Sequence, residues 1–271
     1  MLPATKVVPK EMLPVVDKPV IQYALEEAWA SGIEEAILVT GRGKAAIEDH
    51  FDRAYELEDT LKRKGKTGEL DELASWLPRA GTISYTRQQE PLGLGHAVWC
   101  ARHLVGDEPF AVMLVDDLML GAVPPIKQLI DAHGRTGGSV ISVEEVPREH
   151  TQRYGILVPG ADDGRLVEVR GMVEKPRPEE APSTLSVIGR YVLVPEVFRH
   201  LDRQERGAGG EIQLTDAIAR TIGEAPVHGL RFEGRRYDCG SKLGYLEAQI
   251  ACALEREELR AGVQGLLKRY R

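Results

Sequence analysis

A chain of 271 residues can bury one large core or two small ones, and 42% hydrophobic and 28% charged residues are ordinary for a globular protein. The net charge of −7 argues against nucleic acid or an anionic membrane as the main partner, although a local cationic pocket could still take a phosphorylated small molecule. Three scattered cysteines and the lack of a long apolar run favour a reducing, cytoplasmic compartment and exclude a disulfide framework and a transmembrane helix.

The first half of the chain predicts alternating helices and strands. Prolines recur through residues 1–20, so this segment should be a stiff, extended loop. Residues 53–77 are charged and helical in composition, which indicates a helical insert on the surface. Helices are expected over 19–31, 44–51, 94–104 and 124–133, and strands over 36–40, 82–86, 110–115 and 139–146.

The second half predicts more strands joined by turns. Residues 243–268 should form one or two amphipathic helices, interrupted at Gly262. Together the elements predict an α/β core with a mixed rather than purely parallel sheet. Strands are expected over 155–158, 166–173, 186–194 and 227–232, and helices over 195–201 and 212–222.

Several charged residues are candidates for a functional site, although each also has an ordinary structural explanation. Asp116 follows a strongly apolar strand, where open α/β sheets bind ligands, but it could equally be a helix N-cap. Asp238 precedes Gly240 and a helix, which also suits a cap. Lys10 lies on the stiff N-terminal loop, where little entropy is lost on binding a polyanion. Glu174 and Lys175 could be an exposed ion pair at the end of a strand.

The amino-acid sequence of the N-terminal segment resembles that of a known family. Pro9-Lys10-Glu11-Met12-Leu13-Pro14, followed by Asp17-Lys18-Pro19, is similar to the sugar-phosphate nucleotidylyltransferases, and most of all to the bacterial UTP–glucose-1-phosphate uridylyltransferase family. Several motifs in the right order are more specific than any one of them. Further matching motifs lie near residues 88–97, 113–117, 154–155, 173–176, 209–216 and 237–241.

The resemblance implies a Rossmann-like nucleotidyltransferase fold with a mixed, mostly parallel central sheet flanked by helices. It implies a single domain over 1–271, with a catalytic core at 1–240 and C-terminal helices at 241–271 that could make an oligomer contact in a homodimer or homotetramer. In that family a strand and a Gly-rich loop ending in Gly-Thr-Arg precede Leu-Pro-Ala-Thr-Lys, whereas Met1 stands at this junction here. We therefore expect the catalytic core in this sequence to be N-terminally truncated, through a mis-chosen start codon or a truncated record rather than through a real shortening of the protein.

The resemblance also assigns roles at the phosphate end of a site. It implies that Asp116 and Asp238 are the two protein ligands of Mg²⁺, an ion that suits few carboxylates together with phosphate oxygens and water. Lys10 would face the triphosphate and Lys175 the phosphate of the sugar phosphate, while Glu174 would accept hydrogen bonds from sugar hydroxyls. Asp117 should point away from the site and is given no ligand role.

At the base and sugar ends the resemblance implies five further contacts. Glu11, Gln88 and the backbone at Gly93 would hydrogen-bond the uracil edge, whereas His96 should only pack at a helix start. Near the sugar, Gly155, in the turn Tyr154-Gly155, and Val187 would line the hexose pocket. Glu211 and Asp216 are left out of the site as cap and first-turn residues.

The activity that follows is transfer of a uridylyl group from UTP to α-D-glucose 1-phosphate, giving UDP-glucose and pyrophosphate. Gly93-Leu-Gly-His-Ala97 resembles uridylyltransferases, whereas the thymidylyltransferase relatives typically show Gly-Leu-Ala-Gln there. Two alternatives stay open at this stage. One is the same reaction with dTTP and a sugar 1-phosphate, and the other is a protein that binds nucleotide sugars without turnover.

Overall fold

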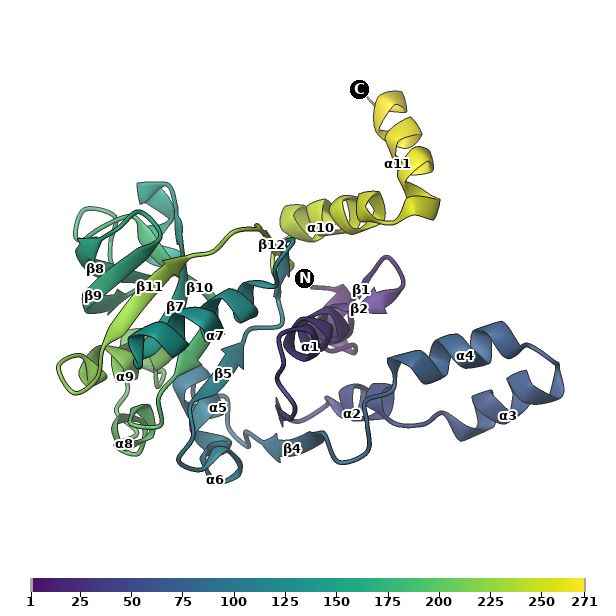
Figure 1. The fold of residues 1–271 in the computed structure, drawn as a ribbon, viewed down its shortest axis with the longest axis horizontal. Coiled ribbons are helices and arrows are strands. Elements are labelled where there is room, and N and C mark those ends of the chain that lie inside the picture. The colour runs from purple at the N-terminus through teal and green to yellow at the C-terminus, as the bar shows by residue number, and fades with distance from the viewer. Residues whose placement is uncertain (1, 271) are drawn as a thin grey trace.

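The computed structural model describes residues 2–270, and its centre is a six-stranded sheet in the order β5-β10-β7-β11-β9-β8 (Figure 1). β10 is buried along its whole length because it has neighbours on both sides and helices over both faces. The strands are β5 (Phe110–Met113), β7 (Ser139–Glu145), β8 (Gly155–Asp162), β9 (Leu166–Glu174), β10 (Leu185–Leu193) and β11 (Val227–Arg231).

Successive side chains of these strands point to opposite faces of the sheet, and each face packs into its own hydrophobic core. On β7, Val140 packs against α7 (Pro125–Thr136), while Ile141 and Val143 face the opposite side. α7 presents Ile126, Leu129 and Ala132 as one apolar stripe to the sheet. The opposite face is covered by α5 (Leu94–Cys100), α8 (Val197–Leu201) and α9 (Leu214–Thr221).

The N-terminal third forms a smaller layer beside the sheet. β3 (Ala36–Thr40) and β4 (Ile83–Arg87) pair in parallel, so that their carboxyl ends lie together. α1 (Val20–Ala30) and α2 (Ala45–Phe51) cover this pair with an apolar cluster around Leu25 and Phe51. The segment before α1 contains short 3-10 helices at Ala4–Lys6 and Lys10–Met12 and the two-residue strands β1 (Pro14–Val15) and β2 (Lys18–Pro19).

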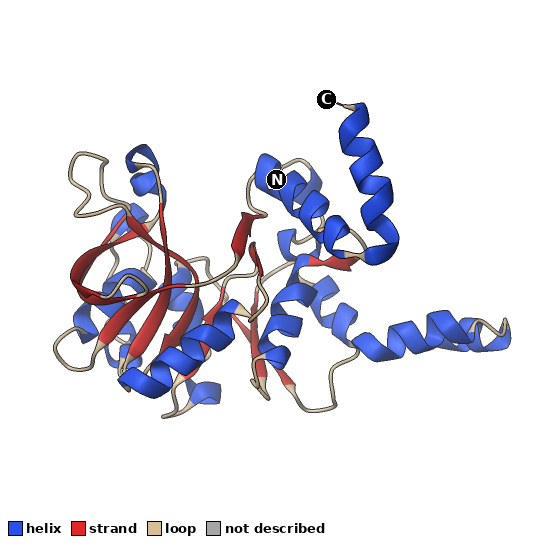
Figure 2. Ribbon diagram, turned by 45° about the horizontal axis from the view of Figure 1, so that its top comes forward, coloured by secondary structure: helices blue, strands red, loops and turns tan. Residues whose placement is uncertain are grey.

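Two helical features project from this body. α3 (Tyr55–Arg63) and α4 (Thr67–Trp76) form a hairpin that extends away from the sheet and buries none of its residues, as expected for a surface insert (Figures 1 and 2). At the C-terminal end α10 (Lys242–Glu255) packs on the strand before it, and α11 (Glu257–Arg269) turns away (Figure 1). No helix among residues 2–270 is long and apolar enough to cross a membrane.

Several expectations need correction. The sheet is mixed, as predicted, but antiparallel neighbours predominate: within the six strands only β7 and β11 pair in parallel. The helix expected over 94–104 breaks at Ala101 into α5 and α6 (Arg102–Val105). The C-terminal break lies at Arg256, whose backbone is extended, and Gly262 is inside α11. The guanidinium of Arg256, at this break, contacts Asp17.

Two short strands were missed by sequence reasoning. β6 (Asp117–Leu120) and β12 (Arg235–Asp238) form an antiparallel pair in which Asp117 stands opposite Asp238. Each has only four residues, and they are more than a hundred residues apart in the chain, so local periodicity carried little signal. Their pairing is what brings the two ends of the candidate site together.

Candidate functional site

The carboxylates of Asp116 and Asp238 converge. Asp116 immediately precedes β6 and Asp238 ends β12, and the amide of Cys239 donates to the carbonyl of Asp116 at 2.8 Å. A Cβ placed on Gly240 would stand 3.0 Å from Asp238 Oδ1 and 3.5 Å from Asp116 Oδ2. Carboxylate oxygens of both aspartates therefore lie beside the same glycine, at the start of the turn that leads into α10.

The Asp238 carboxylate has a local structural partner, because its Oδ1 accepts from the amide of Gly240 at 2.9 Å. Ser241, not Asp238, caps α10, because its hydroxyl accepts from the amide of Gly244. Asp116 does follow a strand, as predicted, but β5 pairs with an antiparallel neighbour, β10, rather than a parallel one. The residue after it departs in part from the expectation: the Asp117 carboxylate accepts from the amide of Gly189 at 3.1 Å, yet Asp117 also lines the cavity described below.

Two cations balance the convergent carboxylates. Lys10 Nζ lies 2.6 Å from Asp116 Oδ2, and Arg153 Nη2 lies 3.4 Å from Asp238 Oδ2. Burial acts to lower the pKa of the Lys10 ammonium, but Asp116 outweighs it and the net pKa is raised. Lys10 is therefore charged at neutral pH and can meet an anion beside the aspartates.

A cavity of about 310 Å³ opens beside these groups and gathers most of the expected phosphate and sugar residues. The Glu174 side chain in its wall is only 9% exposed, and its carboxylate stands 3.3 Å from Lys175 Nζ. The lining residues are Leu94, Leu114, Asp116, Asp117, Arg153, Tyr154, Gly155, Glu174, Lys175, Val187, Gly189, Tyr191, Glu211, Gln213, Leu214, Thr215, Arg236 and Asp238.

Backbone geometry explains two positions in this wall. A Cβ on Gly155 would stand 2.7 Å from the Thr215 hydroxyl and 3.1 Å from the Glu174 carboxylate, so glycine is needed there. Lys175 adopts φ +48°, which is uncommon for a residue with a side chain, and its amide donates to the carbonyl of Tyr154 at 2.9 Å. This strained backbone conformation fixes the direction in which the Lys175 side chain projects from the end of β9.

The residues expected to bind the base lie outside this cavity wall. Gln88 follows β4, and its side-chain Nε2 contacts the carbonyl of Gly93 at 2.9 Å and His96 Nδ1 at 3.1 Å. His96 also stacks on Trp99, which supports a packing role. Gly93 has φ +113° and no room for a Cβ, which would stand 2.7 Å from the carbonyl of Ile212.

Glu11, the third residue expected to contact the base, is held by Lys44. Its Oε1 accepts from Lys44 Nζ at 2.7 Å, and Lys44 lies just after β3, beside the end of β4 that leads to Gln88. The other carboxylate oxygen, Oε2, is buried and has no hydrogen-bond partner among the described residues. An unpaired buried carboxylate oxygen is costly, so it is suited to a ligand N–H.

Sequence reasoning missed four residues of the site. Arg153 and Lys44 were not singled out, and Glu211, although it lies in the motif at 209–216, had been left out as a cap residue; Arg153 and Glu211 line the cavity. Arg236 could have been found, because it is two residues before Asp238 on β12 and shares its face. Asp216, also left out, stays outside the cavity wall; burial raises the pKa of its carboxyl.

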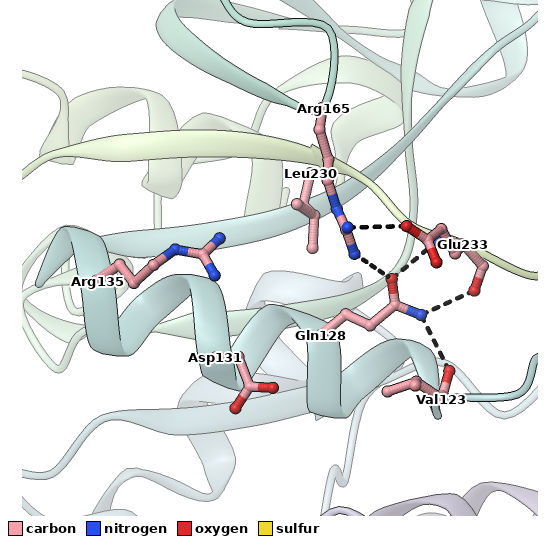
Figure 3. A pocket seen from close by; sticks show the side chains of 7 residues that line it. All are labelled: Val123, Gln128, Asp131, Arg135, Arg165, Leu230 and Glu233. Atoms are coloured by element: carbon pink, nitrogen blue, oxygen red, sulfur yellow. Dashed lines mark hydrogen bonds and ion pairs between the residues drawn. The ribbon is translucent and has the colours of Figure 1, made fainter.

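A second cavity of about 290 Å³ lies between α7 and the loop after β11 (Figure 3). Three of its polar residues, Gln128, Arg165 and Glu233, bond to one another. Arg165 pairs with Glu233 at 2.8 Å and donates to Gln128 Oε1 at 3.1 Å, while the Gln128 amide nitrogen donates to the carbonyls of Val123 and Glu233 (Figure 3). Because these bonds join α7 to the loop after β11, the cavity is a weaker candidate for a catalytic site than the first cavity.

Known proteins resemble this chain over most of its length. A family model described as "Nucleotidyl transferase" matches residues 1–254. A UTP–glucose-1-phosphate uridylyltransferase of Komagataeibacter xylinus is 56% identical over 242 residues, covering 89% of this chain and 85% of that protein.

Two solved structures extend the likeness to the whole fold. A UTP-bound UGPase from Acinetobacter baumannii has a TM-score of 0.90 at 41% identity, covering 98% of this chain and 93% of that one. A UDP-glucose pyrophosphorylase complexed with UDP-glucose has a TM-score of 0.85 at 41% identity, covering 94% of each chain. The family and fold expected from the sequence motifs are thereby confirmed.

Proposed function

This chain belongs to the nucleotidyl transferase family, and we infer that it transfers the uridylyl group of UTP to α-D-glucose 1-phosphate, forming UDP-glucose and pyrophosphate. The observation that carries this function is the convergence of Asp116 and Asp238 next to a cavity that holds Lys175, with Lys10 on Asp116. Relatives with 51–56% identity that carry this activity in their names support UTP over dTTP.

The reaction needs two polyanions to be held together. A phosphate oxygen of glucose 1-phosphate forms a bond to the α-phosphorus of UTP, the bond from that phosphorus to the bridging oxygen breaks, and pyrophosphate leaves with the electron pair. The nucleophile is already an anion, so no strong general base is required, and catalysis rests on position and charge. Lys10 would offset charge on the triphosphate and the departing pyrophosphate, and Lys175 would hold the sugar phosphate.

The aspartate pair also suits a bound Mg²⁺. Carboxylate oxygens of both residues lie beside Gly240, and among residues 2–270 no group of three or more His, Cys, Asp or Glu could hold a metal by itself. This is the ligand set expected when phosphate oxygens and water complete the coordination. Mg²⁺ held by Asp116 and Asp238 would supply charge stabilisation to the phosphate oxygens as pyrophosphate departs.

The sugar end of the cavity fits a hexose. We propose that the buried Glu174 carboxylate accepts from sugar hydroxyls, that Gly155 lets the backbone approach the ring, and that Val187 provides an apolar wall. The Glu174 carboxylate and Lys175 Nζ are 3.3 Å apart. Glu174 would therefore accept from the hydroxyls of the sugar phosphate while Lys175 binds the phosphate of the same molecule.

At the base end the unpaired oxygen of Glu11 has the right chemistry for uracil. Uracil presents one N–H donor between two carbonyl acceptors, and Glu11 Oε2 is a buried acceptor without a donor. We propose that it accepts from that N–H, with Lys44 holding the other oxygen, and that Gln88 and the backbone of Gly93 contact the rest of the edge.

The exposed C-terminal helices and the free cysteines bear on assembly and location. We propose a single domain, residues 1–271, whose C-terminal helices join copies in a homodimer or homotetramer. The support is that the side chains of Leu243, Leu246, Leu266 and Leu267 are exposed along these helices. A cytoplasmic location fits the three cysteines, which are all free thiols.

An assay of pyrophosphate release tests the proposed function. With UTP, glucose 1-phosphate and Mg²⁺, we expect one UDP-glucose per pyrophosphate and no release when either substrate is omitted. Replacing UTP by dTTP should lower kcat/KM. A higher kcat/KM with dTTP would instead identify a thymidylyltransferase, and binding of UDP-glucose without any turnover would identify a binding protein.

A further inference from the structure

The most enclosed charged group of the molecule lies directly behind Asp116. Arg190, on the central strand β10, is 1% exposed, and each of its five guanidinium N–H groups has an acceptor within the protein. Two donate to the Glu27 carboxylate, with a closest distance of 2.7 Å. The other three donate to the carbonyls of Leu114 at 2.9 Å, Asp117 at 2.9 Å and Gly189 at 3.0 Å.

Two of these carbonyls belong to the segment that carries Asp116. Leu114 and Asp117 are the first and last residues of the turn between β5 and β6, and one guanidinium holds both ends of it. The same turn is tied to Gly189 by two more bonds: the Leu114 amide donates to the Gly189 carbonyl at 2.8 Å, and the Gly189 amide donates to Asp117 Oδ2. Asp116 thus leaves a turn whose backbone has little freedom.

Glu27 orients the guanidinium from the opposite side. It lies on α1, its side chain is 7% exposed, and its Oε1 also accepts from the amide of Ile126 in the first turn of α7 at 3.0 Å. Because α1 follows the segment that carries Lys10, the Glu27–Arg190 pair connects that segment and α7 to the Asp116 turn.

A buried ion pair is a poor way to gain stability. Desolvation of both charges offsets most of their attraction, and well-packed apolar residues often stabilise a fold equally well. A planar guanidinium can, however, bridge acceptors in a fixed geometry, which an apolar side chain or the point charge of a lysine cannot do. The arrangement therefore suits a role in geometry more than in stability.

We propose that Glu27 and Arg190 are positioning residues that fix the Asp116 carboxylate opposite Asp238, acting through the backbone of Leu114 and Asp117. This inference rests on the proposed function, because it assigns the pair to the cation and phosphate end of that same site. Neither residue lines the cavity, so neither touches a substrate.

The test compares Glu27→Gln with Val197→Ala, a cavity-forming control on α8, where no site residue lies. Three quantities are measured: kcat and KM for both substrates, the Mg²⁺ concentration for half-maximal rate, and UTP affinity by calorimetry with and without Mg²⁺. We expect Glu27→Gln to lower kcat roughly 10-fold or more and to raise the Mg²⁺ requirement, as replacements behind metal ligands do, with little change in KM for glucose 1-phosphate.

The control should lose thermal stability while keeping its kcat and Mg²⁺ requirement. In an Asp116→Asn background, Glu27→Gln should have almost no further effect on kcat, because both changes act through one carboxylate. If Glu27→Gln does not fold, Glu27→Asp, which keeps the charge and shortens its reach, provides the same comparison.

A folded Glu27 variant with unchanged kcat and unchanged Mg²⁺ requirement would overturn the proposal, and so would full additivity with Asp116→Asn. If the unsubstituted protein shows no turnover, the proposed function fails, and calorimetry still decides the inference: Glu27→Gln must weaken the Mg²⁺-dependent part of UTP binding and spare the Mg²⁺-independent part. Absence of any Mg²⁺-dependent part would refute the positioning role as well.

Discussion

At the scale of single residues, the site is a set of opposite charges kept close without a ligand. Lys10 and Arg153 each contact one of the convergent aspartates, at 2.6 Å and 3.4 Å. In the bound state, substrate phosphates would pair with these cations and a metal ion would bind the carboxylates instead. The motif around Lys10 allowed its role to be predicted from sequence, whereas Arg153 could not be predicted because only the fold brings it to Asp238.

Replacing Lys10 by alanine should slow the chemical step more than it weakens binding. The lysine would stabilise charge that builds up on the departing pyrophosphate, so we expect kcat to fall by roughly 100-fold while KM for UTP rises less. Steady-state kinetics at saturating substrate measures both values. Lys6→Ala, an exposed lysine of the same segment, is the matched control and should behave as the unsubstituted protein. A Lys10 variant with unchanged kcat would remove the lysine from the mechanism.

At the scale of elements, the N-terminal segment is held in place by the C-terminal helices. The β1–β2 turn lies on α10, where the Gln249 side chain bonds the amide of Val16 at 2.7 Å and the carbonyl of Pro14 at 2.6 Å. Asp17 in the same turn pairs with Arg256 at the α10–α11 junction. Sequence periodicity located both helices but not their junction, because no glycine or proline marks it and the residue there, Arg256, pairs with a residue far away in the sequence.

The Asp17–Arg256 pair should stabilise the fold in a pH-dependent way. The hydrogen bond from Arg256 lowers the pKa of the Asp17 carboxyl in the folded state. Its contribution is therefore complete above the unfolded pKa, about 3.9, and is lost as the pH falls through the lower folded value. Because the pair is partly exposed, Asp17→Asn should cost no more than about 1 kcal/mol at pH 7.

Denaturant unfolding of both proteins at pH 7 and in strong acid checks this expectation. The difference in unfolding free energy between Asp17→Asn and the unsubstituted chain should shrink as the pH is lowered through that range. A difference that is the same at both pH values would show that the carboxylate charge of Asp17 contributes nothing.

At the scale of the whole molecule, the sequence predicted the kinds of elements better than their neighbours. The apolar runs at β5, β7 and β10 and the stripe on α7 follow from local periodicity. The strand order and the excess of antiparallel pairs depend on which faces can be buried together, which no local pattern contains. The same holds for the candidate site. Its motifs were predicted from the sequence, whereas the β6–β12 pairing that brings Asp116 and Asp238 together was not.

The central claim is that Asp116 and Asp238, more than a hundred residues apart in sequence, act as one unit on a shared cation. The most direct measurement is a double-mutant cycle of Asp116→Asn and Asp238→Asn on kcat for pyrophosphate release at saturating Mg²⁺. We expect each single change to lower kcat by several orders of magnitude and the double variant to be about as slow as the slower single one. Folded variants whose losses multiply independently, or a single variant that keeps its full rate, would contradict the account.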